Sequence, residues 1–171
     1  MALRDFTKLH VVYAERSLFD PDIVYLYTSN GGLILVKNAR DRQGNPIPRW
    51  FVSRHAHVFY LRRDGRFSHR KPSYRPLRHG RGGCVNYLDF PELNYPLHLM
   101  VINTWKGVKP FPHYQCDHID GNPRNNDIDN LEWVTPEEHI RRRYQMFHAR
   151  FKVVDPHALA EREPHKYADE N

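Results

Sequence analysis

The sequence has 171 residues, of which 40% are hydrophobic and 13% aromatic, enough to build one folded domain or one domain with an appended arm. The net charge of +6 indicates either a solvated basic surface or an affinity for polyanions. With only two cysteines, Cys84 and Cys116, and no apolar run of membrane-spanning length, the composition argues against a disulfide scaffold, a four-cysteine zinc site and helical membrane spans.

The first 16 residues lack the apolar core and the small-residue cleavage site of a signal peptide. We therefore expect a cytoplasmic protein with two reduced thiols and no membrane partner. Further along, residues 23–28 and 33–37 are rich in Val, Ile, Leu and Tyr. The Asn30-Gly31 pair between them favours a hairpin turn, so we predict two paired strands. Residues 41–49 combine Gly, Asn and two prolines and predict a loop.

Residues 51–60 alternate as one strand would, and Asp64-Gly65 supplies a turn, which predicts a second strand pair. Residues 71–83 carry prolines, glycines and basic side chains with little apolar content, and we expect an exposed loop there. Residues 84–90 predict a short strand.

Two helices are predicted in the second half. Pro96 suits a first helical turn and Gly107 a helix end, which predicts a short helix between them. Thr135 with Glu138 three residues later forms a capping box, with a proline at the first helical position between them. This pattern predicts a helix over 136–150.

Positive charge is concentrated in residues 49–82, which hold ten arginine or lysine residues and one acid. Nine of the ten are arginine, whose guanidinium suits bidentate contacts to phosphate and guanine. A solvated basic face is the alternative, but the charge falls on a predicted turn and loop that can follow a nucleic-acid backbone. The candidate contacts in this segment are Arg62, Arg63, Arg66, Arg70, Lys71, Arg75, Arg78 and Arg81.

The stretch "DHIDGNPRNNDIDNLEWVTPEEH", residues 117–139, gathers many polar side chains. A calcium loop of the EF-hand kind does not fit, because the required acids and glycine fall at the wrong positions. A zinc site drawn from His113, Cys116, His118 and His139 matches no common ligand spacing. A plain polar loop explains the asparagines but not the flanks, which predict strand, loop, strand and helix in that order.

This unit resembles the HNH nucleases of the ββα-metal fold, in particular their homing-type, often phage-encoded branch. The matching residues are Asp117-His118, Asp120-Gly121-Asn122, Asn130, Leu131, Trp133, Thr135, Glu138 and His139. The resemblance is close over residues 96–145 and loose over the first half of the chain. It implies hydrolysis of DNA phosphodiester bonds, by nicking or double-strand cleavage, to 5′-phosphate and 3′-hydroxyl ends.

The resemblance also implies roles. His118 is the general base, since imidazole titrates near neutral pH. Asp117 and His139 hold one divalent metal ion, and Asn130 pins the loop that orients His118. Homing-type relatives commonly carry asparagine in place of His139, and imidazole favours Mn²⁺, Ni²⁺ or Zn²⁺ more than an amide does. We expect Mg²⁺ or Mn²⁺, with Ni²⁺ or Zn²⁺ as alternatives.

Strand geometry adds one condition. Neighbours on a strand point to opposite faces, so Asp117 and His118 should lie where the strand ends and the backbone twists into the loop. The carboxylates of Asp120, Asp127 and Asp129 are expected only to shape and solvate that loop.

The sequence thus predicts an α+β protein: an antiparallel β-rich DNA-binding region over residues 1–95, an HNH ββα-metal nuclease unit over 96–150 and a loose tail over 151–171. Arg141 and Arg142 on the last helix are added as phosphate contacts. Double-stranded DNA is the expected partner of a monomer or homodimer, acting in the host cell if phage-encoded. The alternatives are a non-catalytic nucleic-acid-binding protein that retains the ββα scaffold, and a structural zinc protein.

Overall fold

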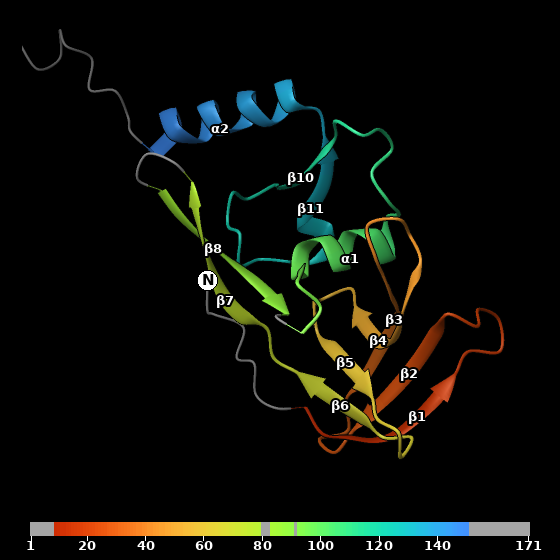
Figure 1. Cartoon of the computed structure of the whole chain (residues 1–171). Helices are drawn as coiled ribbons and strands as arrows, with labels where there is room; N and C mark the ends of the chain where they lie inside the picture. The colour runs from red at the N-terminus through yellow and green to blue at the C-terminus, as the bar shows by residue number, and fades with distance from the viewer. Residues whose placement is uncertain (1–8, 80–82, 91, 151–171) are drawn as a thin grey trace, which may run out of the picture. The chain divides into compact units, whose positions relative to one another are not determined.

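A computed structural model describes residues 9–79, 83–90 and 92–150, and its largest element is an antiparallel sheet of six strands (Figure 1). The strands are neighbours in chain order: β1 (Val11–Arg16), β2 (Ile23–Thr28), β3 (Leu33–Arg40), β4 (Pro46–Ser53), β5 (Val58–Leu61) and β6 (Phe67–Arg70). The sheet curls so that β1 contacts β6, and the backbone N–H of Leu9, just before β1, donates to Nδ1 of His69 at 3.2 Å.

The β2–β3 hairpin confirms the prediction made from Asn30-Gly31. Gly31 has φ of 79°, in the left-handed region that glycine adopts without steric cost. The backbone N–H of Thr28 donates to the carbonyl of Gly32 at 2.8 Å and closes the turn. Strand β3 runs three residues further than predicted, to Arg40.

The loop predicted over residues 41–49 is shorter than expected, because β4 already begins at Pro46, opposite Arg40. Proline fixes φ near the value of extended backbone, so it is compatible with the start of a strand. The register shifts between Asn38 and Arg40, and Arg49 takes φ of 69°, so this part of the ladder is irregular.

The single strand predicted over residues 51–60 is wrong, because a tight turn divides it into β4 and β5. Ser53 and His57 close the turn through their backbones at 2.9 Å, and the Ser53 hydroxyl accepts from the His57 N–H at 3.0 Å. Ala56 takes φ of 61°. The two strands continue the same alternation, and neither glycine nor proline marks the turn between them, so the pattern resembled one strand. The Asp64-Gly65 turn between β5 and β6 is confirmed.

The exposed loop predicted over residues 71–83 is also wrong over much of its length. Residues 73–79 form β7 (Ser73–His79), which pairs with β8 (Gly83–Phe90), and β8 pairs with the short β9 (Tyr95–Pro96). Strand β7 lies at the edge of this sheet, where Pro76 can be accommodated without removing a ladder hydrogen bond. The predicted strand over 84–90 is confirmed.

The second half follows the predicted order. Helix α1 (Leu97–Trp105) begins after Pro96, and strands β10 (Gln115–His118) and β11 (Leu131–Val134) form an antiparallel hairpin. A short 3₁₀ turn, η1 (Ile128–Asn130), precedes β11, and helix α2 spans Pro136–Arg150. The α+β class, with a six-stranded antiparallel sheet followed by a ββα region, is confirmed. The predicted tail, residues 151–171, lies outside the described residues.

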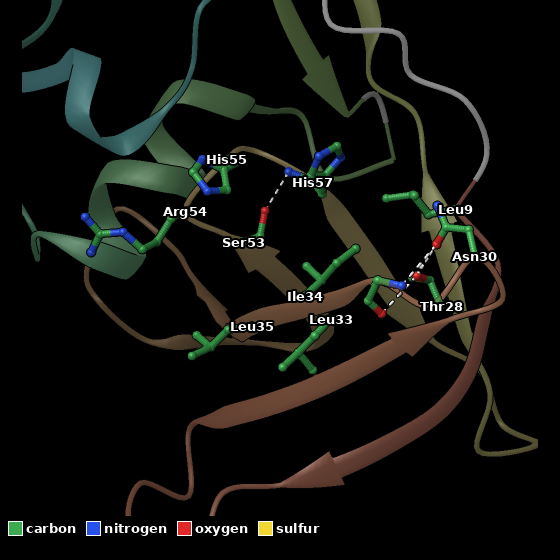
Figure 2. A pocket seen from close by; sticks show the side chains of 11 residues that line it. Leu9, Thr28, Asn30, Leu33, Ile34, Leu35, Ser53, Arg54, His55 and His57 are labelled. Carbon is green, nitrogen blue, oxygen red and sulfur yellow. Dashed lines mark hydrogen bonds between the residues drawn. The ribbon is translucent and has the colours of Figure 1, made fainter.

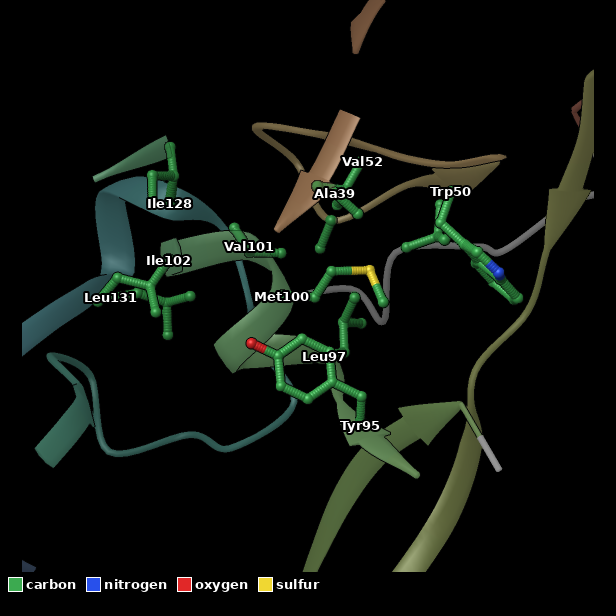
Figure 3. Close-up of a cluster of buried hydrophobic side chains, with 12 residues drawn as sticks. Ala39, Trp50, Val52, Tyr95, Leu97, Met100, Val101, Ile102, Ile128 and Leu131 are labelled. Atoms are coloured by element: carbon green, nitrogen blue, oxygen red, sulfur yellow. The ribbon is translucent and has the colours of Figure 1, made fainter. Parts of the chain in front are cut away.

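The curled sheet and the β10–β11 hairpin share a hydrophobic core with α1 between them (Figure 3). Met100, Val101 and Ile102 of the helix are fully buried and contact side chains from both sides. The sheet contributes Ala39, Trp50, Val52, Ala56 and Val58, and the hairpin contributes Ile128 and Leu131. A second cluster, with Val24, Leu26, Val36, Phe51 and Phe59, fills the inside of the curled sheet.

By its contacts the chain divides into two compact units, Met1–Thr135 and Pro136–Asn171. The sheets, α1 and the β10–β11 hairpin belong to the first unit, and α2 belongs to the second. Among the described residues, no helix has the length and apolar character needed to cross a membrane.

Candidate active site

Asp117 and His118 are the last two residues of β10, opposite Glu132 and Leu131 of β11. Both are buried, with 6% and 7% of their surface exposed. The chain turns immediately after them: Gly121 has φ of 69°, and its N–H donates to the carbonyl of His118 at 2.8 Å. The pair therefore lies where the strand gives way to the loop, as strand geometry required.

The imidazole of His118 is held from two directions. Its Nε2 donates to Oδ1 of Asn126 at 3.0 Å, and Asn126 is only 3% exposed. The ring of His98, on α1, lies edge-on with a centroid distance of 5.5 Å and an interplanar angle of 62°. These contacts restrict the orientation of the ring, and the bond to Asn126 fixes its proton on Nε2. Nδ1 then carries the lone pair.

Burial also determines the charge state of these imidazoles. Burial lowers the pKa of His118 below its ordinary value of 6.5, and it outweighs the Asn126 hydrogen bond and the charges of Asp120 and Asp117, which act to raise that pKa. Desolvation, helped by His118 and Arg42, lowers the pKa of His98 to about 3. Both rings are neutral at pH 7, and a neutral His118 is the form that accepts a proton.

Sequence reasoning missed Asn126 and His98. His98 could have been noticed as a polar residue within the apolar "PLHLMV" segment of a predicted helix. Asn126 carried no local signal, because it is one of several asparagines in the loop and only the folded loop brings it to His118.

Asn130 joins two parts of the loop through its side-chain amide, and its effect on the orientation of His118 stays a prediction. Its Nδ2 donates to Oδ1 of Asp120 at 2.9 Å and to the carbonyl of Asn125 at 2.8 Å, and its Oδ1 accepts from the N–H of Asp120 at 3.0 Å. Although burial acts to raise the pKa of Asp120, hydrogen bonds from Asn125, Asn122 and Asn130 lower it. Three bonds from one side chain thus join the beginning of the loop to its end.

The loop is also tied to the six-stranded sheet through the β4–β5 turn. Arg54 pairs with Asp129 at 3.0 Å, and Nδ1 of His55 lies 2.8 Å from Oδ2 of Asp127. The N–H of Ile128 donates to the carbonyl of Arg54 at 2.9 Å. Asp127 and Asp129 therefore do more than shape and solvate the loop, because they anchor it to a segment more than 70 residues away in sequence.

A pocket of about 410 Å³ is lined by residues of the β2–β3 hairpin and the β4–β5 turn (Figure 2). It runs from Thr28 and Asn30 at the β2–β3 turn, past Leu33 on β3, to Arg54 and His55. The side chains at one end, Arg54 and His55, already contact the loop carboxylates of Asp129 and Asp127. The pocket therefore adjoins the anchoring contacts and is not lined by Asp117 or His118.

The proposed metal ligands lie in different units. Asp117 is in the first, and His139 is the fourth residue of α2 in the second. Across the described part of the chain, no cluster of three or more His, Cys, Asp or Glu side chains is positioned for a metal. The donor types nevertheless suit a divalent cation: a carboxylate as buried as Asp117 needs hydrogen bonds or a cation to compensate for lost hydration. The pairing of Asp117 with His139 remains a prediction.

Cys116 is a free thiol beside Asp117. Burial and the neighbouring Asp117 charge raise the pKa of the Cys116 thiol to about 12, so the free thiol stays protonated at pH 7.

The residues predicted to contact DNA differ in their exposure and in their partners within the protein. Arg62, Arg63 and Arg66 are exposed on the β5–β6 turn, with only a long 3.7 Å pairing from Arg62 to Asp64. Others are engaged within the protein: Arg70 pairs with Glu92 and lies over Trp50, and Glu138 pairs with both Arg141 and Arg142. Lys71 follows β6 and is exposed. The backbones of Arg75 and Arg78 lie in β7, and Arg81 lies outside the described residues.

Residues 95–141 match a family model described as HNH endonuclease. A solved structure, titled "DNA binding and cleavage by the HNH homing endonuclease I-HmuI", is similar over 72% of this chain with 24% sequence identity and a TM-score of 0.38. The alignment spans 66% of that chain, slightly under two thirds of its length. No curated protein matches the sequence.

Proposed function

We propose that this chain, whose residues 95–141 match the HNH endonuclease family model, is a metal-dependent DNA endonuclease. It hydrolyses phosphodiester bonds and leaves 5′-phosphate and 3′-hydroxyl ends. The observation that carries the proposal is the buried His118, neutral and with its proton fixed on Nε2 by Asn126, at the end of β10 beside Asp117. This arrangement is that of a general base prepared to activate water.

In the proposed reaction, Nδ1 of His118 removes a proton from the attacking water. Asn126 keeps the ring in one tautomer and orientation, and His98 limits its rotation. Asn130 holds together the loop that follows His118 through its bonds to Asp120 and Asn125. A divalent cation held by Asp117 and His139 would supply positive charge for the phosphate and for the leaving 3′ oxygen.

DNA binding is proposed for the exposed arginines of the β5–β6 turn and the basic residues that follow it. The turn presents Arg62, Arg63 and Arg66 to solvent with one acid, Asp64, among them. Contacts of this kind go to phosphates, so they supply affinity and register without reading sequence. One site of this kind cuts one strand, so the first product should be a nick.

The deciding experiment is the incubation of supercoiled plasmid with the protein and Mg²⁺, Mn²⁺, Ni²⁺, Zn²⁺ or EDTA, followed by gel analysis of nicked and linear product. We expect nicking that requires a metal and disappears in His118→Ala while DNA binding in EDTA persists. His10→Ala, which alters an exposed histidine, is the matched control and should cleave normally. Normal cleavage by His118→Ala would refute the assignment, and binding without cleavage under every metal would favour a non-catalytic binding protein.

A further inference from the structure

The connection between α1 and β10 carries a cluster of three aromatic side chains, Phe111, His113 and Tyr114, which we call the aromatic cluster. The rings of Phe111 and His113 are stacked, with centroids 5.9 Å apart and an interplanar angle of 18°. Tyr114 completes the cluster at 5.6 Å from Phe111 and 5.2 Å from His113. In contrast to the aromatic residues of the core, Phe111 is 56% exposed, and His113 is exposed as well.

The connection is held in shape at both ends. The carbonyl of Gly107 accepts from Nε1 of Trp133 on β11 at 3.0 Å, which fixes its beginning to the hairpin. Nearer the cluster, Nζ of Lys109 donates to the carbonyl of Pro112 at 2.5 Å, and the N–H of Tyr114 donates to the carbonyl of Phe111 at 3.1 Å. The rings are therefore presented in one arrangement before any partner binds, which lowers the entropic cost of binding.

The charge of this connection selects the class of partner. Residues 106–114 contain Lys106 and Lys109 and no acid. Both lysines are exposed, and each has its ammonium directed to a backbone carbonyl, Lys106 to that of Leu131 and Lys109 to that of Pro112. A segment that carries exposed rings, two lysines and no acid is complementary to a ligand that combines flat π-surfaces with phosphates, which describes a nucleic acid.

The aromatic cluster is also close to the proposed chemistry. Tyr114 immediately precedes β10, and Asp117 and His118 end that strand. At about 3.3 Å per strand residue, Tyr114 lies about 10 Å from Asp117. A base contacting the cluster would then be within a few nucleotides of the phosphate at His118.

We infer that the aromatic cluster stacks on an unpaired or unstacked DNA base next to the scissile phosphate. The inference rests on the proposed function and gives this site a second kind of DNA contact, through base faces in addition to phosphates. Stacking of this kind tolerates any base, because every base presents a π-face. Bases that leave the helix more readily, at bulges or mismatches, should be bound more tightly than paired ones.

The test uses the full chain in EDTA, where no cleavage occurs, and a DNA duplex with one bulged 2-aminopurine compared with the fully paired duplex. We expect wild-type protein to prefer the bulged duplex and to quench its fluorescence. Phe111→Ala should lose this preference, with binding of the bulged duplex weakened about 10-fold, while Phe111→Trp retains it. Phe19→Ala is the matched control, since Phe19 is 98% exposed on the β1–β2 connection and should not matter.

Equal binding of both duplexes by wild-type protein would overturn the inference. A Phe111→Leu variant that binds and quenches like Phe111→Trp would also overturn it, because apolar contact without stacking would then be sufficient. Loss of a concentration-dependent dimer in Phe111→Ala, with DNA binding unchanged, would instead assign the cluster to self-association. The outcomes distinguish the two proposals. Plasmid nicking without bulge preference overturns the stacking inference and leaves the nuclease assignment intact. Bulge binding without nicking under any metal overturns the nuclease assignment, and with it the placement of the base beside a scissile phosphate, but leaves base stacking by the cluster.

Discussion

His118 and Asn126 are joined by a hydrogen bond of 3.0 Å between Nε2 and Oδ1, with both residues buried. An amide oxygen can only accept, so this bond assigns the proton of a neutral His118 to Nε2. The Nδ2 of Asn126 points to the carbonyl of Arg124, at 3.4 Å, which agrees with this orientation of the amide. The bond therefore selects the nitrogen that can act as a base.

Replacement of Asn126 should lower the cleavage rate without changing the affinity for DNA. Asn126→Leu removes the acceptor, and we expect the single-turnover cleavage rate at saturating DNA to fall about 10- to 100-fold, because the ring is no longer held in the reactive tautomer. Asn126→Asp keeps an acceptor oxygen and should recover most of the rate. DNA affinity in EDTA should be unchanged in both. Equal impairment of the two variants would indicate that Asn126 supports the loop without orienting His118.

Asn130 should matter for stability as well as for activity. Asn130→Ala removes three side-chain hydrogen bonds that close the loop, and we expect about 1–3 kcal/mol loss of unfolding free energy in urea. The control is Asn122→Ala, since the exposed Asn122 side chain accepts a single bond, from the N–H of Arg124. If both variants lose the same free energy, the bracing role is wrong.

The identity of residue 139 should determine metal preference. His139→Asn replaces an imidazole by an amide, and we expect the ratio of nicking rates in Ni²⁺ or Mn²⁺ to those in Mg²⁺ to fall. Calorimetric titration should show weaker Ni²⁺ binding in the same variant, a readout that does not depend on turnover. Asp117→Ala should weaken binding of every metal tested. Unaltered Ni²⁺ affinity in His139→Asn would remove His139 from the ligand set.

The exposed arginines of the β5–β6 turn should determine the salt dependence of DNA binding. Each phosphate contact contributes about one unit to the slope of log affinity against log salt, so Arg63→Ala with Arg66→Ala should reduce the slope by about two. The measurement is fluorescence anisotropy across a salt series in EDTA. Arg16→Ala is the control, as Arg16 is exposed on β1 and donates to the carbonyl of Pro21. An unchanged slope in the double variant would place DNA elsewhere.

Acid should destabilise the curled sheet through His69. Burial, followed by the charges of His57 and Lys71, lowers the pKa of His69 from 6.5 to about 4. A histidine with a lowered folded-state pKa contributes its full stability above pH 6.5, and loses it as pH falls towards 4. The loss amounts to about 3 kcal/mol at most. Protonation would also remove the acceptor for the N–H of Leu9.

The His69 effect is measured by comparing urea unfolding at pH 7 and pH 4.5. His69→Gln retains an acceptor but does not titrate, so its loss of stability between the two pH values should be smaller than that of the wild type. Some pH dependence should remain, because the pKa of His98 is lowered in the same direction. His10→Gln should behave as wild type. Identical pH dependence in His69→Gln would contradict the prediction.

Local patterns were sufficient where local chemistry decides the structure. Asn30-Gly31 predicted the β2–β3 turn, Pro96 the beginning of α1 and Pro136 that of α2, because each restricts the backbone at its own position. The hairpin around Asp117 and His118 was predicted from its flanks. Its residue pattern resembles the HNH family, whose model matches residues 95–141.

Contacts between distant segments were beyond local patterns. The turn at Ala56 has no glycine or proline to mark it, and its function becomes visible only where Arg54 meets Asp129 from the other half of the chain. Pro76 argued for a loop, yet it is accommodated in β7 because that strand is at a sheet edge, a property of the assembled sheet. Asn126 likewise becomes informative only after the loop has folded onto His118.

The core around α1 limits how segments of this chain could be exchanged for foreign ones. Met100, Val101 and Ile102 are completely buried between side chains of the six-stranded sheet and side chains of the hairpin. A chimera that joined residues 96–150 to a foreign N-terminal region would expose this apolar face, unless the new region supplied surfaces equivalent to Trp50 and Val52. Replacement of surface turns, such as β5–β6, should therefore be tolerated more readily than replacement of whole segments.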